Sequence, residues 1–167
     1  MSKQKIELYV PLHVSAAAAR DIAMQVLDAV AKRRAPYEHV MLTAGLRELH
    51  VPMSGVVSVP VNASVDPHPL RWECGIVLEA ENNRTLFPRF DGTITVTPNG
   101  TAEAELWMQG AYEPPLGAIG AGADAALLHG AAEGSLRAFL TWLASEVRRL
   151  VEERERETMR AARQTHF

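Results

Sequence analysis

The fold is decided by the stretch GAYEPPLGAIG, which runs from Gly110 to Gly120. Strand-like alternation fills the middle of the chain before this stretch, and one long helical pattern follows it. The pair Pro114-Pro115 ends a strand because a proline has no N–H to give to a neighbouring strand. Pro115 also suits the first turn of a helix, where that N–H would have no partner. The stretch therefore predicts a junction between a sheet and a helix that runs almost to the C-terminus.

The composition is that of an ordinary globular domain. The chain has 167 residues, of which 47% are hydrophobic and 22% charged. A net charge of -3 argues against a sequence-independent nucleic-acid binder, which needs a basic face. The single cysteine, Cys74, allows no intrachain disulfide and no cysteine-based zinc site, and its strand context predicts a small buried hydrophobe. With no signal-peptide core and no apolar run of ~18–20 residues, we expect a cytoplasmic protein without an integral membrane segment.

The part of the chain before the junction predicts one helix and several antiparallel strands. A strand from Lys5 to His13 precedes an alanine-rich helix from Ala16 to about Arg34, for which Ser15 is a suitable N-cap. The segment 37–45 has a weak pattern that fits either a short helical turn or a strand. Alternating apolar residues, separated by turn signals, predict further strands within 57–65, 70–80, 90–97 and 103–110. Such turn-linked strands form an antiparallel sheet with one apolar face.

The part of the chain after the junction predicts a long helix with a charged end. Apolar residues keep helical spacing from Leu136 to Val151, and the run Glu152–Glu157 beyond them is charged and solvated. We expect Glu152 and Arg156 to form an ion pair across one helical turn. Residues 1–155 are predicted to form one domain, and residues 156–167 a charged tail that frays. The tail could pair with a second copy in a homodimer, although it lacks the apolar seam of a coiled coil.

The order of elements predicts an α+β domain in which the long helix covers the apolar face of the sheet. Two local motifs add to this pattern: FPRFDG at residues 87–92, and GAYEPPLG at residues 110–117, followed by Asp124 and Ala131-Ala132. Together they resemble the helix-grip fold of the START/Bet v 1-like superfamily, also called SRPBCC, and in particular a bacterial subgroup of its polyketide cyclase/dehydrase-like members. The chain departs from the usual pattern in having one long helix after the first strand.

The resemblance implies a curved antiparallel sheet wrapped around the C-terminal helix, with an apolar cavity between them. It implies a small hydrophobic molecule or a lipid as the partner. We expect no cofactor. The resemblance transfers no catalytic residue, because members of the superfamily differ in their chemistry and a fold does not fix a function.

Small residues recur every fourth position along the predicted long helix, at Ala118, Gly122, Ala126, Gly130, Gly134 and Ala138. Glycine in a helix costs roughly 1 kcal/mol against alanine, so we expect a compensating role. One hypothesis is that this row faces the sheet and leaves room for a ligand. The alternatives are close helix–sheet packing without a cavity, a kink, or glycines that are simply exposed.

The candidate ligand-binding residues are those expected on the apolar faces of the strands and of the long helix. They are Trp72, Phe90, Met108, Tyr112, Leu116, Ile119, Ala126, Leu127, Gly130 and Gly134. The same side chains could instead fill a dry core. Their pattern alone does not separate the two interpretations.

The polar candidates are His129, Glu133 and Tyr112. His129 and Glu133 lie one helical turn apart and could act as an acid/base pair, and Tyr112 could place a hydroxyl at the cavity mouth. The six histidines show no metal-ligand spacing, so we expect no metal site.

Three function classes follow from these candidates. The first is a binder of a small hydrophobic ligand or lipid. The second is a cyclase- or hydrolase-like enzyme that uses the same cavity. The third is an interaction module with a filled core, whose working surface is Trp107 and the charged helix end.

Overall fold

The computed structural model describes residues 3–45, 56–68, 72–82, 87–113 and 125–164. The elements in chain order are β1 (Gln4–Pro11), α1 (Ala16–Ala31), β2 (Met41–Gly45), β3 (Val56–Pro67), β4 (Glu73–Ala80), β5 (Arg89–Asn99), β6 (Glu103–Glu113) and α3 (Ala125–Gln164). The predicted strands are present, and the weak segment 37–45 contains a short strand, β2, which pairs with β3.

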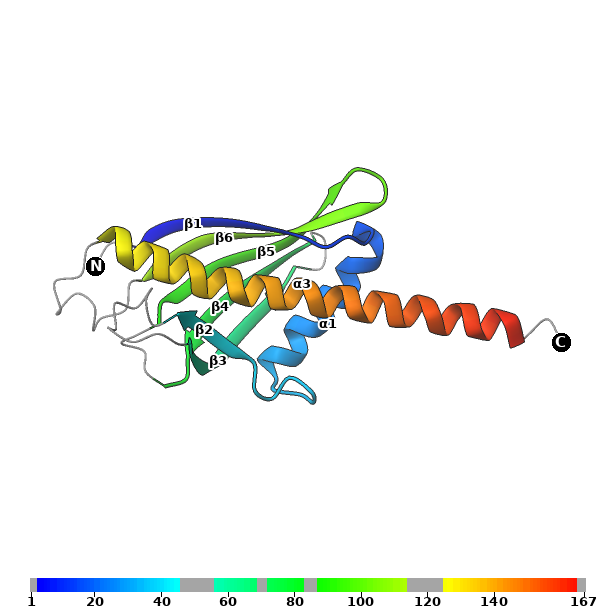
Figure 1. Cartoon of the computed structure of the whole chain (residues 1–167), viewed down its shortest axis with the longest axis horizontal. Helices are drawn as coiled ribbons and strands as arrows, with labels where there is room; N and C mark the ends of the chain where they lie inside the picture. Colours follow the sequence, from blue (N-terminus) through cyan, green and yellow to red (C-terminus); the bar gives the residue numbers. More distant parts are fainter. Residues whose placement is uncertain (1–2, 46–55, 69–71, 83–86, 114–124, 165–167) are drawn as a thin grey trace.

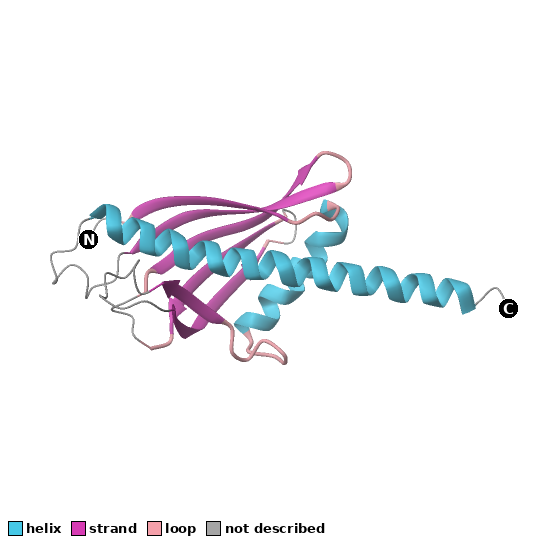
Figure 2. Cartoon of the chain, in the orientation of Figure 1, coloured by secondary structure: helices cyan, strands magenta, loops and turns pink. Residues whose placement is uncertain are grey.

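The strands form one six-stranded sheet in the order β1-β6-β5-β4-β3-β2, with every neighbouring pair antiparallel. The sheet curls along α3, so that the helix contacts the edge strands β1 and β2 (Figure 1). Helix α1 packs against α3 and against β3, β5 and β6. The predicted α+β helix-grip architecture is therefore confirmed, with the secondary structure drawn in Figure 2.

Helix α1 begins where the sequence predicts. Ser15 is its N-cap, and the Ser15 Oγ accepts a hydrogen bond from the backbone N–H of Ala18 at 3.3 Å. The helix ends at Ala31, three residues before the expected end at Arg34, with Lys32 as its C-cap. A cis peptide bond between Ala35 and Pro36 follows in the loop that leads to β2.

One apolar core lies between the concave face of the sheet and the two helices. The strands contribute alternate residues to it, and these are buried: Ile6, Leu8, Leu42, Val59, Val61, Cys74, Ile76, Leu78, Phe90, Ile94, Leu106 and Met108. Cys74 is fully buried, as predicted, and this burial raises the pKa of its thiol to about 11. The thiol is therefore protonated at neutral pH and unsuited to nucleophilic chemistry.

The described members of the predicted row of small residues are not buried against the sheet. Gly130 and Ala138 are exposed and Gly134 is half-buried, and a Cβ added at Gly130 would meet nothing within 4 Å. Ala118 and Gly122 lie outside the described residues. The alternative of exposed glycines is the one found at Gly130.

The rotation of α3 is set by its large apolar residues. The side turned to the core carries Ala131, Ala132, Ser135, Leu136, Phe139, Leu140, Leu143, Ala144, Val147 and Val151. Burying each large side chain gains about 1.5–3 kcal/mol, whereas an exposed helical glycine costs only about 1 kcal/mol. The apolar stripe therefore outweighs the glycine spacing in deciding which side of the helix is buried.

Helix α3 continues to Gln164, and its C-terminal part extends beyond the sheet and α1 in Figure 1. The expected ion pair between Glu152 and Arg156 is wrong, because the Arg156 Nε–H donates instead to the backbone oxygen of Glu152 at 3.1 Å. Among the helices of the described residues, none is both long and apolar enough to cross a membrane.

A polar contact joins the loop before β2 to the middle of α3. The Tyr37 hydroxyl donates to Glu146 Oε1 at 2.5 Å, and the Arg149 guanidinium binds the same carboxylate. Burial and the Glu146 contact raise the pKa of Tyr37 to about 12. The Arg149 hydrogen bond lowers the pKa of Glu146.

We expect Tyr37 to make the domain less stable in alkali. Its pKa is higher in the folded chain, so its contribution is complete below the ordinary tyrosine value near 10 and is lost as the pH rises through about 12. Urea unfolding at pH 9 and pH 11 should show a smaller loss of unfolding free energy in Tyr37→Phe than in the wild type. An equal loss in both proteins would contradict this assignment.

Candidate ligand-binding site

A pair of facing glycines shapes the sheet where the site lies. Gly92 of β5 and Gly110 of β6 are partners in the strand register. A Cβ at Gly92 would lie 2.2 Å from the Gln109 backbone oxygen, and one at Gly110 would lie 2.4 Å from the Asp91 oxygen. The Phe90 ring also lies within 3 Å of both Cβ positions (2.7 and 2.9 Å), so it covers the glycines on the inner face. Only glycine therefore lets the strands and this ring approach so closely.

Tyr112 is the last residue of β6 whose side chain lies on the inner face of the sheet. Strand β6 continues through Tyr112 to Glu113, and Tyr112 is fully buried on the same face as Met108. In the register, Tyr112 lies opposite Phe90 on one side and Gln4 on the other. Strand β6 therefore extends into the stretch that the sequence assigns to the junction, as far as Glu113.

The Tyr112 hydroxyl joins three elements. It donates to Gln4 Oε1 on β1 at 2.5 Å, and it lies 2.8 Å from His129 Nδ1 on α3. Because its only proton goes to Gln4, the remaining bond needs His129 to donate from Nδ1–H. In neutral His129, Nε2 is then left as an acceptor. Burial raises the pKa of Tyr112, which keeps the hydroxyl protonated at neutral pH.

The predicted pair of His129 and Glu133 is not formed. Glu133 Oε1 binds the Arg137 guanidinium at 2.7 Å, one turn farther along α3, and the hydrogen-bond partner of His129 is Tyr112. The sequence identified His129 and Tyr112 separately but gave no sign that they touch. It missed Gln4, a polar residue at the start of the first strand, because only the β1–β6 register places Gln4 beside Tyr112.

Beside His129, the core side of α3 is made of small residues. Ala131, Ala132 and Ser135 are buried, and from His129 onward the first large buried side chain is Leu136. The Ser135 hydroxyl donates to the Ala131 carbonyl at 3.1 Å, so its polarity is satisfied within the helix. This section of α3 therefore presents a surface of short, effectively apolar side chains next to the Tyr112–His129 contact.

The other predicted ligand-binding residues are dispersed. Phe90 and Met108 are fully buried in the core, as expected for its lining. Trp72 was expected on the apolar face, but it is 59% exposed, because it precedes β4 and lies against Arg20 of α1. Leu116 and Ile119 lie outside the described residues. The side chains of Ala126 and Leu127 are likewise not described.

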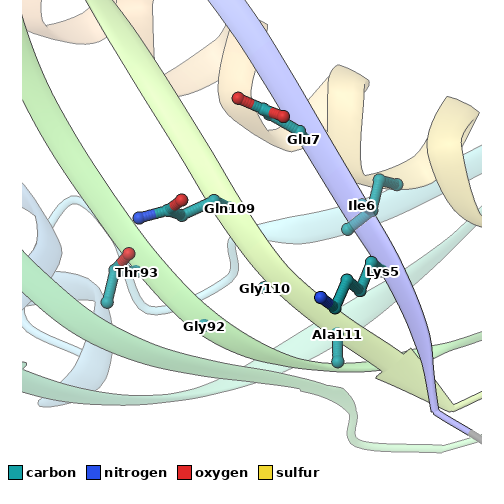
Figure 3. Close-up of a pocket in the computed structure, with 8 residues that line it drawn as sticks. All are labelled: Lys5, Ile6, Glu7, Gly92, Thr93, Gln109, Gly110 and Ala111. Atoms are coloured by element: carbon teal, nitrogen blue, oxygen red, sulfur yellow. The ribbon is translucent and has the colours of Figure 1, made fainter.

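A hollow of about 680 Å³ lies on the outer face of the sheet (Figure 3). Its side chains include Lys5, Glu7, Thr93 and Gln109, which alternate with the buried residues of β1, β5 and β6. It is therefore separate from the cavity that the sequence predicted between sheet and helix.

Trp107 also lies on the outer face, as predicted. Its ring stacks on Tyr9 with centroids 5.9 Å apart, and its indole N–H donates to Glu7 Oε1 at 3.1 Å. Trp107 itself is half-buried and Tyr9 is half-exposed. The polar edge of Trp107 is thus already satisfied within the sheet.

A curled antiparallel sheet that holds one long helix defines the helix-grip class of α+β proteins. Comparison with solved structures places the chain in that class: it has the START/Bet v 1-like fold. The Zhui aromatase/cyclase from Streptomyces sp. R1128 is 15% identical, with a TM-score of 0.54 and matches over 90% of this chain and 96% of that one. Norcoclaurine synthase from Thalictrum flavum is 14% identical, with a TM-score of 0.51 and coverage of 91% and 88%.

A third similar structure is the di-domain ARO/CYC BexL from the BE-7585A biosynthetic pathway. It is 12% identical, with a TM-score of 0.51, and the match covers 87% of this chain and 49% of that one. At these identities the likeness establishes the fold and not an activity. No family model matches the sequence, and no curated protein does either.

Proposed function

We propose that the protein binds a small hydrophobic molecule or lipid between the sheet and α3, with the polar end of the ligand at His129. The observation that carries this proposal is the buried Tyr112 hydroxyl, which is bonded to Gln4 and His129 beside the small residues of α3. An apolar surface with a few convergent polar groups is typical of a small-molecule site.

The strength of such binding would come from burial of apolar surface. Removing ~300 Å² of ligand surface from water at roughly 25 cal/mol per Å² gives about 7 kcal/mol before the entropy cost of association. Phe90, Met108 and Ala132 would supply the apolar contacts. His129 Nε2 would accept one hydrogen bond from the ligand and so fix its orientation.

The same geometry also favours a second candidate, a cyclase- or hydrolase-like enzyme. In the tautomer set by Tyr112, neutral His129 has an unprotonated Nε2 that could take a proton from a bound substrate. Two of the similar structures are named an aromatase/cyclase and a synthase. Native mass spectrometry separates the candidates: a binder releases its copurified ligand unchanged, whereas an enzyme converts it and loses this conversion in His129→Ala.

We expect the polar contact to appear as a preference for a hydroxyl group on the ligand. 1-Naphthol can donate to His129 Nε2 and 1-methoxynaphthalene cannot, so the wild type should bind 1-naphthol about tenfold more tightly in calorimetric titrations. Tyr112→Phe keeps the buried ring but removes the hydroxyl that fixes the tautomer of His129. This variant should therefore reduce the preference for 1-naphthol to about threefold or less. The affinity for 1-methoxynaphthalene should change little.

Two results would contradict the proposal. The first is that neither naphthalene compound binds to the wild type. The second is that Tyr112→Phe keeps the full preference for 1-naphthol, which would mean that the Tyr112–His129 contact does not orient the ligand.

A further inference from the structure

A second candidate site lies at the opposite end of the sheet, where α1 meets the turn between β3 and β4. The guanidinium of Arg20 stacks over the ring of Trp72 there. Val96 of β5 borders this second site and pairs with Leu106 of β6. Phe90, also on β5, pairs instead with Tyr112, which belongs to the first site. Six residues of strand separate the two positions on β5, which is roughly 20 Å. The Arg20 site is therefore distinct from the Tyr112–His129 site.

Among the described residues, Arg20 has no polar partner, in contrast to two arginines of α3, Arg137 and Arg149. Arg137 and Arg149 bind carboxylates, whereas Arg20 makes no hydrogen bond or ion pair in the described part of the chain. Its Nε is buried and unsatisfied. The terminal nitrogens are not among the buried atoms, so they remain open to a ligand. A partly buried guanidinium without a partner is costly, and an anion would relieve that cost.

The surroundings of Arg20 form a small hollow of about 200 Å³. Met24, Pro67 and Val96 give it apolar walls, and the Trp72 ring adds a flat aromatic surface. Asp21 and His68, both exposed, lie at its border. This volume is below that of pockets for drug-sized molecules, so the occupant must be small.

We propose that this hollow binds a small carboxylate that carries an aromatic or other flat apolar group. The planar fork of a guanidinium matches the geometry of a carboxylate, and an arginine held on an aromatic ring keeps its fork oriented. The apolar walls favour such a ligand over a bare inorganic anion. Asp21 opposes the anion, but its exposure to solvent weakens that repulsion.

Benzoate is the probe that tests this proposal, and the indole N–H of Trp72 is the reporter. In ¹H–¹⁵N spectra of the full chain, the Trp72 signal is assigned from its loss in Trp72→Phe. Benzoate should shift this signal in a saturable way, and neutral benzyl alcohol should bind at least about tenfold more weakly. Inorganic phosphate, which lacks the apolar group, should also bind more weakly than benzoate.

Two variants of neighbouring residues should change benzoate affinity in opposite directions. Arg20→Gln should weaken it at least about tenfold. Asp21→Asn should strengthen it about two- to fivefold, because it removes the opposing charge without touching Arg20. Tyr112→Phe should leave it unchanged, since that residue lies at the other end of the sheet. This independence separates failure of the Arg20 site from failure of the ligand site beneath α3.

Three outcomes would overturn the proposal. They are unchanged benzoate affinity in a folded Arg20→Gln, equal binding of benzyl alcohol and benzoate, and equal binding of phosphate and benzoate. If Arg20→Gln does not fold, Asp21→Asn decides the matter, because weaker or unchanged benzoate binding in that variant contradicts an anion site.

Discussion

Gly92→Ala is expected to lower the free energy of unfolding by about 3 kcal/mol, in the upper range for overpacked sites. The added Cβ would lie 2.2 Å from the Gln109 backbone oxygen and 2.7 Å from the Gly110 Cα. Neither is the end of a flexible side chain, so β5 and β6 would have to separate. The Phe90 ring, 2.7 Å from the same Cβ position, would be displaced as well. Urea unfolding followed by circular dichroism measures the change.

Gly75→Ala is the matched control for this experiment. Gly75 lies on β4, the neighbouring strand of the same sheet, and its nearest contact to an added Cβ is an ordinary 3.5 Å, to Asp66. We expect the unfolding free energy of this variant to stay within about 0.5 kcal/mol of the wild type. If Gly92→Ala and Gly75→Ala were equally stable, the close approach of β5 and β6 would be wrong.

Ala132→Leu is expected to reduce the affinity for 1-naphthol at least about tenfold while the protein stays folded. Ala132 is buried on the core side of α3, three residues after His129. If a ligand occupies the space beneath these small residues, the leucine side chain takes that space and is tolerated. Calorimetric titration gives the affinity, and thermal unfolding tests the fold.

Gly130→Leu is the control for Ala132→Leu on the same helix. Gly130 is exposed, nothing lies within 4 Å of its Cβ position, and leucine favours a helix more than glycine does. We therefore expect unchanged 1-naphthol affinity and equal or greater stability. A dry, filled core would give a different pattern, in which Ala132→Leu loses about 1–3 kcal/mol of stability from overpacking and the wild type binds no 1-naphthol.

Much of the fold could be predicted from local patterns. Alternation along β4, β5 and β6 identified strands and their buried faces, and Ser15 identified the start of α1. These predictions succeed because a strand with one buried face has a strict two-residue period, and a helix start needs a capping oxygen. The resemblance in the motifs around Phe90 and Tyr112 also indicated the correct class of fold.

The wrong predictions concern features that are determined by packing between distant parts of the chain. One hypothesis from the spacing of small residues placed Gly130 toward the sheet, but Gly130 is exposed, because the stronger apolar stripe from Leu136 onward sets the rotation of α3. Strand alternation was extended through Trp72, which lies outside β4 and against α1. Helical spacing suggested Glu133 as the partner of His129, but it equally allowed the bond from Glu133 to Arg137 that forms.

The candidate site could be predicted only in part. His129 and Tyr112 were recognisable as polar residues near a junction, but their 2.8 Å contact depends on how α3 crosses the end of β6. Gln4 enters the site through the pairing of β1 with β6, which joins residues 108 positions apart in the chain. Such pairings cannot be read from local sequence patterns, because the register between distant strands depends on tertiary packing.

The position of a bound ligand can be measured by intermolecular nuclear Overhauser effects from 1-naphthol in the ¹³C-labelled protein. Binding between the sheet and α3 predicts effects to the methyl groups of Met108 and Ala132, both buried on the facing surfaces of those layers. Effects confined to the methyl group of Thr93 would instead place the ligand in the outer hollow. That result would contradict a ligand site beneath α3.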